Sequence, residues 1–289
     1  NGVAEAQFHM AKMYDQGEGV SQDYNEAFQW YELAAKQGYG PGKTYIYQLA
    51  KKAVAPALKV LTDQANNGVA EAQFHMGKMY DQGEGVSQDY NEAFKWYELA
   101  AEQDYAQGKT YIYQLAKKAV APALKFLTDQ ANNGVAEAQF HMAKMYDQGE
   151  GVPQDYNEAF KWYRLASKQG YGPGKTYIYR IAKKGVAPAF KVLTDQANNG
   201  VAEAQFHMGK MYDQGEGVPQ DYNEAFKWYE LAAKQGYAQG KTYIYRIAKK
   251  GVAPAFKFLT DQANNGVAEA QFHMGKMYDQ GEGVPQDYN

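Results

Sequence analysis

The sequence repeats itself every 66 residues. The segment that begins at Asn1 begins again at Asn67, Asn133, Asn199 and Asn265, and the first two copies differ at only seven of 66 positions. A repeat of this length is typical of stacked supersecondary units that form an open solenoid. We therefore predict one solenoid domain over residues 1–289, built from units 1–66, 67–132, 133–198 and 199–264 and a partial unit 265–289.

The first half of each unit has the pattern of a helix hairpin with a long loop. Apolar residues recur at helical spacing over Val3–Gln16, and Gly17 then interrupts the pattern. Asp23 stands where a helix N-cap is expected, and Glu26 follows three residues later, which is the spacing of a reciprocal capping box. Gly38 stands where a left-handed C-terminal cap is expected.

The second half has the pattern of a shorter hairpin. We expect one helix over residues 42–52, a turn, and another helix over 56–66 with Pro56 at its first position. The two halves align when Ala11 is placed on Ala50 and Ala27 on Ala57, so the second hairpin resembles the first with a shortened loop. The prediction is an all-α chain of about 17 helices in alternating long-loop and short-loop hairpins.

Composition excludes several classes of partner and site. Thirty basic residues against 33 acidic ones leave a net charge of −3, without the basic excess expected of a protein that binds nucleic acid or anionic lipid. No apolar run approaches the roughly 18 residues of a membrane span, and the start has no signal-peptide pattern. Cysteine is absent, so cysteine-based chemistry is excluded. We predict no nucleic-acid or membrane partner, and the sequence leaves the compartment open.

Residue patterns that could indicate catalysis are weak. Gly42-Lys43-Thr44 resembles the end of a phosphate-binding loop, but Gln37 stands where that motif needs glycine, so we interpret Gly42 as a helix-start residue. Glu5 and His9 share a helix face, but no nucleophile stands at a matching register. The other histidines, one per unit, are too far apart to share a metal ion. We predict no catalytic residue, metal or cofactor, and a core role for Trp30, Trp96, Trp162 and Trp228.

The long-loop hairpin resembles the Sel-one-like repeat (SLR) family, which is related to the tetratricopeptide repeats. The resemblance is carried by Ala6-Gln7-Phe8, Gly83-Glu84-Gly85-Val86 and Ala93-Phe94-Lys95-Trp96-Tyr97, and the same string recurs five times, the last copy truncated. It implies a right-handed α/α superhelix that binds a protein or peptide partner. Ala11 and Ala143 replace the usual glycine of the family pattern, and we expect slightly wider helix packing there.

In related repeats the first helix of each hairpin lines the concave face, which predicts a partner-binding row. By the alignment of the two hairpins, the row consists of His9, Gln48, His75, Gln114, His141, Arg180, His207 and Arg246, with Lys12 and Lys51 one helical turn away. We therefore predict a non-enzymatic interaction scaffold that binds protein or peptide partners through many weak contacts.

Two other functions stay open. The near-identical copies, which alternate between Tyr-Gly-Pro-Gly at Tyr39 and Tyr-Ala-Gln-Gly at Tyr105, favour an engineered or consensus scaffold with no natural ligand. Such a scaffold would associate head to tail, because neither end of the chain has the polar cap usual in solenoids. The other alternative is a glycan-binding or envelope protein, in which the tryptophans would stack on sugars.

Overall fold

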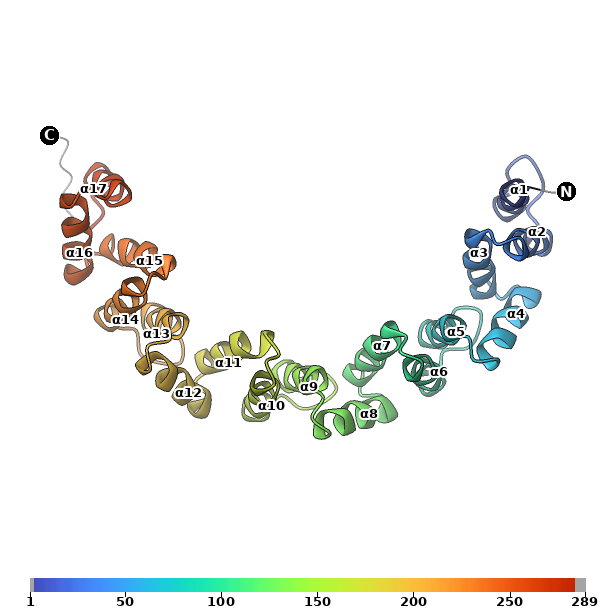
Figure 1. The fold of residues 1–289 in the computed structure, drawn as a ribbon, viewed down its shortest axis with the longest axis horizontal. Coiled ribbons are helices and arrows are strands. Elements are labelled where there is room, and N and C mark those ends of the chain that lie inside the picture. Colours follow the sequence, from blue (N-terminus) through green and yellow to red (C-terminus); the bar gives the residue numbers. More distant parts are fainter. Residues whose placement is uncertain (1–2, 284–289) are drawn as a thin grey trace. The chain divides into compact units, whose positions relative to one another are not determined.

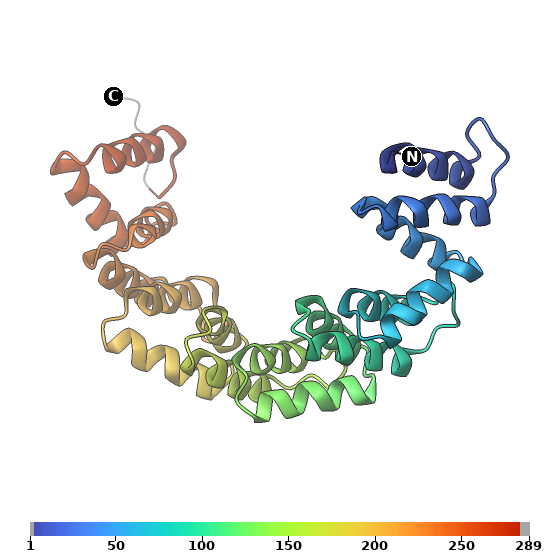
Figure 2. The same cartoon turned by 45° about the vertical axis from the view of Figure 1, so that its right-hand side comes forward.

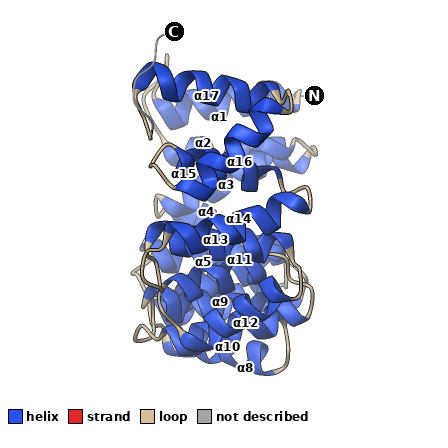
Figure 3. Cartoon of the chain, turned by 90° about the vertical axis from the view of Figure 1, so that its left-hand side faces the viewer, coloured by secondary structure: helices blue, strands red, loops and turns tan. Residues whose placement is uncertain are grey.

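The computed structural model describes residues 3–283, and every regular element in this range is an α-helix (Figure 3). The described residues form seventeen helices, labelled in Figure 1. The predicted all-α class, the helix number and the alternation of long and short loops are confirmed. None of the helices between residues 3 and 283 is both long and apolar enough to span a bilayer.

The helices recur with the 66-residue period. The first helices of the units are α1 (Ala4–Gln16), α5 (Ala70–Gln82), α9 (Ala136–Gln148), α13 (Ala202–Gln214) and α17 (Ala268–Gln280). The second helices are α2 (Tyr24–Lys36), α6 (Tyr90–Glu102), α10 (Tyr156–Lys168) and α14 (Tyr222–Lys234). The third helices are α3 (Gly40–Lys51), α7 (Ala106–Lys117), α11 (Pro173–Lys183) and α15 (Ala238–Ala248). The fourth helices are α4 (Ala55–Asn66), α8 (Ala121–Asn132), α12 (Ala187–Asn198) and α16 (Ala253–Asn264).

The helices group into two compact parts, Asn1–Gln130 with Glu150–Val152, and Ala131–Gly149 with Pro153–Asn289. Within each part, successive helices pack on each other, from α1 to α7 in the first part and from α9 to α17 in the second, and the hairpins are plain in Figure 2. Some helices also contact the next helix but one: α11 contacts α13, α13 contacts α15, α2 contacts α4, α10 contacts α12 and α14 contacts α16. Each part therefore has an odd-numbered and an even-numbered helix layer with the core between them. One domain over the whole chain stays a prediction, and residues 284–289 of the partial unit lie outside the described range.

Helix starts follow local sequence signals. The Asp23 carboxylate accepts hydrogen bonds from the backbone N–H groups of Asn25 (2.8 Å) and Glu26 (3.1 Å), so the predicted N-cap is confirmed. The return bond of the capping box is replaced, because the Asp23 N–H donates to the carbonyl of Tyr14 at 2.9 Å. Gly38 has φ +81° and so adopts the predicted left-handed conformation. Helix α4 begins one residue before Pro56, which occupies the second helical position.

Tyrosines and phenylalanines fill the core of the long-loop hairpins. Tyr97 has no exposed surface, and Phe74 packs against it and against Tyr105 and Tyr111, with ring centroids 5.7, 5.3 and 5.1 Å apart. The four tryptophans are partly buried against the same core, as predicted.

The alanines that replace glycine on the first helices are accommodated by a ring shift. A Cβ on Gly77 would lie 2.6 Å from the Tyr97 ring, so Ala11 and Ala143 need extra room. The centroid separations of the second- and third-helix tyrosines are 5.0 Å (Tyr31–Tyr45), 4.9 Å (Tyr163–Tyr177), 5.2 Å (Tyr97–Tyr111) and 5.3 Å (Tyr229–Tyr243). The first two pairs belong to the alanine-containing hairpins, so the two tyrosine rings lie slightly closer together there than in the glycine-containing hairpins.

Gly42 has a packing role that differs from the predicted helix start. It is the third residue of α3 and is buried, and a Cβ there would lie 2.8 Å from the Tyr31 carbonyl oxygen and 2.9 Å from the Ala35 nitrogen. The missing side chain therefore lets the backbones of α2 and α3 approach each other. Gly40, two residues earlier, has no neighbouring atom within 4 Å of the same position, so the constraint is specific to Gly42.

Candidate functional site

All members of the predicted row lie on, or at the end of, odd-numbered helices. His9 and Lys12 lie on α1, His75 on α5, His141 on α9, His207 on α13, Gln48 and Lys51 on α3, Gln114 on α7, Arg180 on α11 and Arg246 on α15. His9, Gln48, Gln114, Arg180 and Arg246 are exposed, and the others are half-buried. Within each compact part, the alignment of the two hairpins therefore places these residues in the odd-numbered layer.

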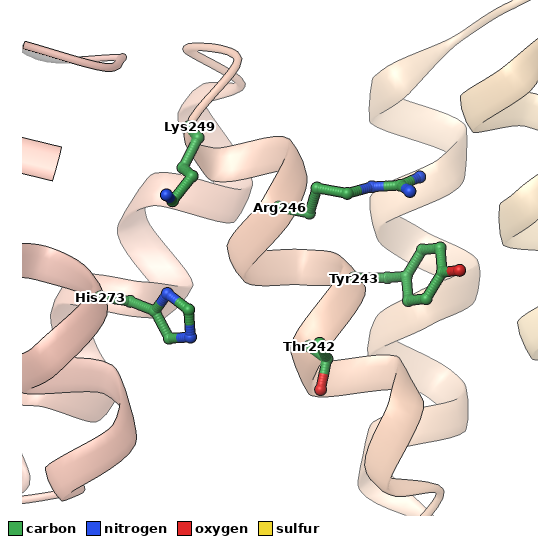
Figure 4. Close-up of a pocket in the computed structure, with 5 residues that line it drawn as sticks. All are labelled: Thr242, Tyr243, Arg246, Lys249 and His273. Carbon is green, nitrogen blue, oxygen red and sulfur yellow. The ribbon is translucent and has the colours of Figure 1, made fainter. Parts of the chain in front are cut away.

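A surface pocket over α15 and α17 brings together three kinds of residue from this row. The pocket has a volume of about 400 Å³ and is lined by Thr242, Tyr243, Arg246, Lys249 and His273. Lys249 is the copy of Lys51 in the fourth repeat, and His273 is the copy of His9 in the fifth. Figure 4 shows Lys249 and His273 on one side of α15, and Tyr243 and Arg246 on the other. The volume lies within the range typical of ligand pockets.

Arg246 is held in place by an aromatic ring and a buried carboxylate. Its guanidinium carbon lies 4.2 Å from the centroid of the Tyr243 ring. The same guanidinium forms an ion pair with Asp213, whose side chain is only 1% exposed. Lys250 contacts the other carboxylate oxygen at 3.1 Å. One side of the pocket is therefore a preorganised cation stacked on an aromatic ring.

The buried aspartates were missed from the sequence. In each repeat, an aspartate in the last turn of the first helix accepts a hydrogen bond from the buried tyrosine of the second helix at 3.2–3.4 Å. These aspartates are Asp15, Asp81, Asp147 and Asp213. In the first repeat Lys52 holds Asp15 at 2.7 Å, whereas in the third repeat Arg180 pairs with Asp147. An acidic residue at a helix C-terminus opposes the helix dipole, and its recurrence there was the available signal for an ion pair.

Of the two predicted lysines, Lys51 is paired within the chain, and so are its copies in the third and fourth repeats. Lys51 contacts Glu84 at 2.9 Å, Lys183 contacts Glu216 at 2.9 Å, and Lys249 contacts Glu282 at 3.1 Å. Each partner belongs to the long loop of the following hairpin, so the lysine joins the third helix of one unit to the next unit. The charges of Lys249 and Arg246 beside the pocket are therefore largely balanced within the chain.

The histidines pack on the tyrosine of the preceding third helix. Ring centroids are 4.7 Å apart for Tyr47 and His75, and 4.7 Å apart for Tyr179 and His207. Burial lowers the pKa of His75 and of His207 to about 4, from an ordinary value of 6.5. Both imidazoles are therefore neutral near pH 7, where each can donate one hydrogen bond and accept another.

These shifts predict a loss of stability in mild acid. Because the folded-state pKa lies below the unfolded value, the unfolded chain binds more protons between pH 6.5 and 4. The contribution of each histidine is complete above pH 6.5 and is lost as the pH falls toward 4. After reduction for solvent screening, we expect about 1 kcal/mol for each histidine between pH 7 and 5.

Urea unfolding at the two pH values measures this loss. The variant carrying His75→Gln and His207→Gln should show a pH-dependent loss that is smaller by about 2 kcal/mol. Equal losses in the variant and the parent chain would contradict the assignment, and each single variant should lie halfway between them.

Helix hairpins that repeat along residues 3–283 and pack on their neighbours define the chain as an α/α-repeat protein. The family model of the Sel1 repeat matches residues 4–39, 70–105, 136–171, 202–237 and 268–289, which is more than half of the chain. The chain therefore belongs to the Sel1 repeat family, and the resemblance of the long-loop hairpins is confirmed.

Several curated proteins are similar over long segments. The chain is 28% identical to chitin synthase regulatory factor 3 of Schizosaccharomyces pombe, over 83% of this chain and 29% of that protein. It is 24% identical to the chitin synthase regulator SKT5 of Saccharomyces cerevisiae, over 80% of this chain and 38% of that protein. It is 33% identical to the exopolysaccharide production negative regulator of Rhizobium meliloti, over 37% of this chain and 48% of that protein. The chain thus spans less than half the length of each of these relatives.

Two solved structures are also similar. The Sel1 repeat protein from Oxalobacter formigenes is 27% identical, with 99% of this chain and 80% of that chain covered and a TM-score of 0.41. The c5321 antigen of uropathogenic Escherichia coli, described as displaying an SLR fold, is 27% identical, with 98% and 66% covered and a TM-score of 0.39.

Proposed function

We propose that the chain is a non-enzymatic scaffold that binds a protein or peptide segment across the exposed face of its odd-numbered helices. The observation that carries this proposal is the pocket over α15 and α17, which combines a stacked arginine, an exposed threonine and a histidine. An extended segment laid over α15 would meet Tyr243 and Arg246 on one side and His273 on the other, since these side chains lie on opposite sides of α15 in Figure 4.

The same residues recur along the second compact part. The residues that stand 66 positions before the pocket residues are Thr176, Tyr177, Arg180, Lys183 and His207. The guanidinium carbon of Arg180 lies 4.5 Å from the centroid of the Tyr177 ring. A partner with repeated or extended features could engage both sets. Weak contacts at each set then add through effective concentration, which is how a shallow surface reaches useful affinity.

The relatives support a regulatory role for the binding. Two of those named above are regulators of chitin synthase, and one is a regulator of exopolysaccharide production. We propose that this chain likewise acts by holding a protein partner. A glycan-binding role is less favoured, because the tryptophans that would stack on sugars pack against the core.

A peptide library displayed on phage tests the proposal. Peptides selected on the parent chain are measured against the variant carrying Thr176→Arg and Thr242→Arg, two exposed positions where the longer side chain would block the pocket and the equivalent surface one repeat earlier. We expect at least a roughly tenfold loss of affinity, since the variant blocks the proposed contact surface. The control is Lys257→Ala on α16 in the even-numbered layer, where the side chain is 78% exposed.

Binding that survives both threonine substitutions, with circular dichroism unchanged, would rule out the odd-numbered layer as the binding face. Failure to select any peptide on the parent chain would count against peptide binding itself.

A further inference from the structure

One leucine on each second helix is exposed to solvent. Leu33, Leu99, Leu165 and Leu231 are 41–42% exposed, and all four occupy the same register in the even-numbered layer. Each leucine is flanked by two positions four residues apart, one immediately before it and one a helical turn after it. The charges at these flanking positions differ between the repeats.

On α2 and α14 the flanking residues form an ion pair. Lys36 contacts Glu32 at 3.0 Å, and Lys234 contacts Glu230 at 3.0 Å. Opposite charges four residues apart stabilise a helix and leave its surface electrically balanced. On these two helices the charges beside the exposed leucine therefore cancel.

On α6 both flanking residues are acidic, whereas on α10 both are basic. Glu98 and Glu102 flank Leu99, and we define these three residues as the acidic patch. Arg164 and Lys168 flank Leu165, and we define these three as the basic patch. Like charges four residues apart destabilise a helix, so the two glutamates weaken α6 and the two basic residues weaken α10.

The basic patch surrounds a pocket. Phe160, Lys161, Arg164, Leu165 and Lys168 line a volume of about 310 Å³ on α10. Lys161 forms an ion pair with Glu158, whereas among residues 3–283 no carboxylate lies within ion-pair distance of Arg164 or Lys168. The patch thus offers an apolar floor with two available cations.

The acidic patch has the complementary composition. Among the described residues, no cation forms an ion pair with Glu98 or Glu102. Partial burial and the neighbouring Glu102 raise the pKa of Glu98, which is the behaviour of a carboxylate without a compensating cation. Leu99 projects between the two acids as an exposed apolar side chain.

We propose that the basic patch on α10 binds the acidic patch on α6 of a second copy of this chain. Leu99 of one copy enters the pocket formed around Phe160 and Leu165 of the other, and the two glutamates pair with Arg164 and Lys168. The two patches occupy the same position in their repeats but carry opposite charges. This charge complementarity identifies a second copy of the chain as the partner that fills the pocket. The contact is heterologous, since each copy uses a different patch. It leaves the odd-numbered layer free, so it does not depend on the function proposed above.

Sedimentation equilibrium of the purified chain tests the proposal at low and high ionic strength. We expect concentration-dependent association at about 0.02 M salt that weakens strongly at about 0.5 M, because salt screens exposed ion pairs. The acid-reversed variant, Glu98→Lys with Glu102→Lys, and the base-reversed variant, Arg164→Glu with Lys168→Glu, should each associate at least tenfold more weakly than the parent chain.

Mixing the two variants is the decisive measurement. The acid-reversed copy carries two basic patches and the base-reversed copy two acidic ones, so the mixture should associate again although neither variant does alone. The control exchanges the residues on α2, Glu32→Lys with Lys36→Glu, and should behave as the parent chain. The repeat holds glutamate or arginine at the first of these registers and glutamate or lysine at the second, so the fold accepts either charge at both.

A parent chain that stays monomeric at low salt and high concentration would overturn the proposal. Association that is unchanged in both reversed variants would also overturn it, because it would place the contact elsewhere, for example at the ends of the chain.

Discussion

Replacing Tyr97 by alanine should destabilise the chain by about 3–5 kcal/mol, the range found when a large buried aromatic side chain is truncated. The Tyr97 ring has no exposed surface and packs on Phe74 at 5.7 Å and on Tyr111 at 5.2 Å. The substitution leaves a cavity where α5, α6 and α7 meet. Urea unfolding followed by circular dichroism at 222 nm (roughly the helix minimum) measures the loss.

Tyr97→Phe is the matched control for this effect. It keeps the ring and removes only the hydroxyl group, which donates a 3.4 Å hydrogen bond to the Asp81 carboxylate. A hydrogen bond to a charged group is worth about 1.5–3 kcal/mol, and a long one lies at the low end, so the phenylalanine variant should lose roughly half as much as the alanine variant or less. Similar losses in the two variants would show that the hydroxyl group, and not ring packing, stabilises the hairpin.

The helices and their order were predictable because their signals are local. Apolar spacing over Val3–Gln16, the N-cap at Asp23 and the left-handed Gly38 each depend on a few neighbouring residues. The 66-residue period then multiplies each signal, so one correct unit describes the whole chain. The family resemblance added that hairpins stack, which matches the packing of successive helices from α1 to α7 and from α9 to α17.

Contacts between distant segments were not predictable in the same way. Gly42 looked like a helix-start residue because its close approach to Tyr31 and Ala35 depends on how α2 and α3 cross. The carbonyl of Tyr14 accepts the hydrogen bond that the capping box assigned to Glu26, because the long loop folds back over α1. Both features follow from tertiary packing, which a spacing rule does not contain.

In the candidate site, too, the positions of residues along the repeat were predictable, and the contacts between distant residues were not. Aligning the two hairpins predicted that His9 and Gln48 occupy equivalent positions, and both lie on odd-numbered helices. Their binding role stays a prediction. The pairing of Arg180 with Asp147 was not foreseen, because the two residues lie 33 positions apart and the aspartate looked like an ordinary polar residue. Comparison of the repeats nevertheless indicates the pairing, because glutamine replaces arginine only in the repeats where Lys52 or Lys118 contacts the aspartate.

Replacing Asp213 by alanine should destabilise the chain by about 2–3 kcal/mol, because it leaves the buried Tyr229 hydroxyl without a partner and removes the carboxylate that two half-exposed cations share. The Asp213 side chain is 1% exposed, pairs with Arg246 and Lys250, and accepts a hydrogen bond from the buried Tyr229 hydroxyl at 3.2 Å. Without the carboxylate, that hydroxyl group is buried and unpaired, while the two cations repel each other. Urea unfolding at neutral pH measures the effect.

Arg246→Gln separates the role of the carboxylate from that of the arginine. Glutamine is the residue at Gln48 and Gln114, where a lysine alone holds the aspartate at 2.7 Å. Lys250 already lies 3.1 Å from Asp213 and can take over the ion pair, so this variant should lose less than about 1 kcal/mol. If Arg246→Gln instead costs as much as Asp213→Ala, the arginine is structural. A small loss would mean that units three and four carry arginine for a purpose other than stability, which is what a partner-binding face requires.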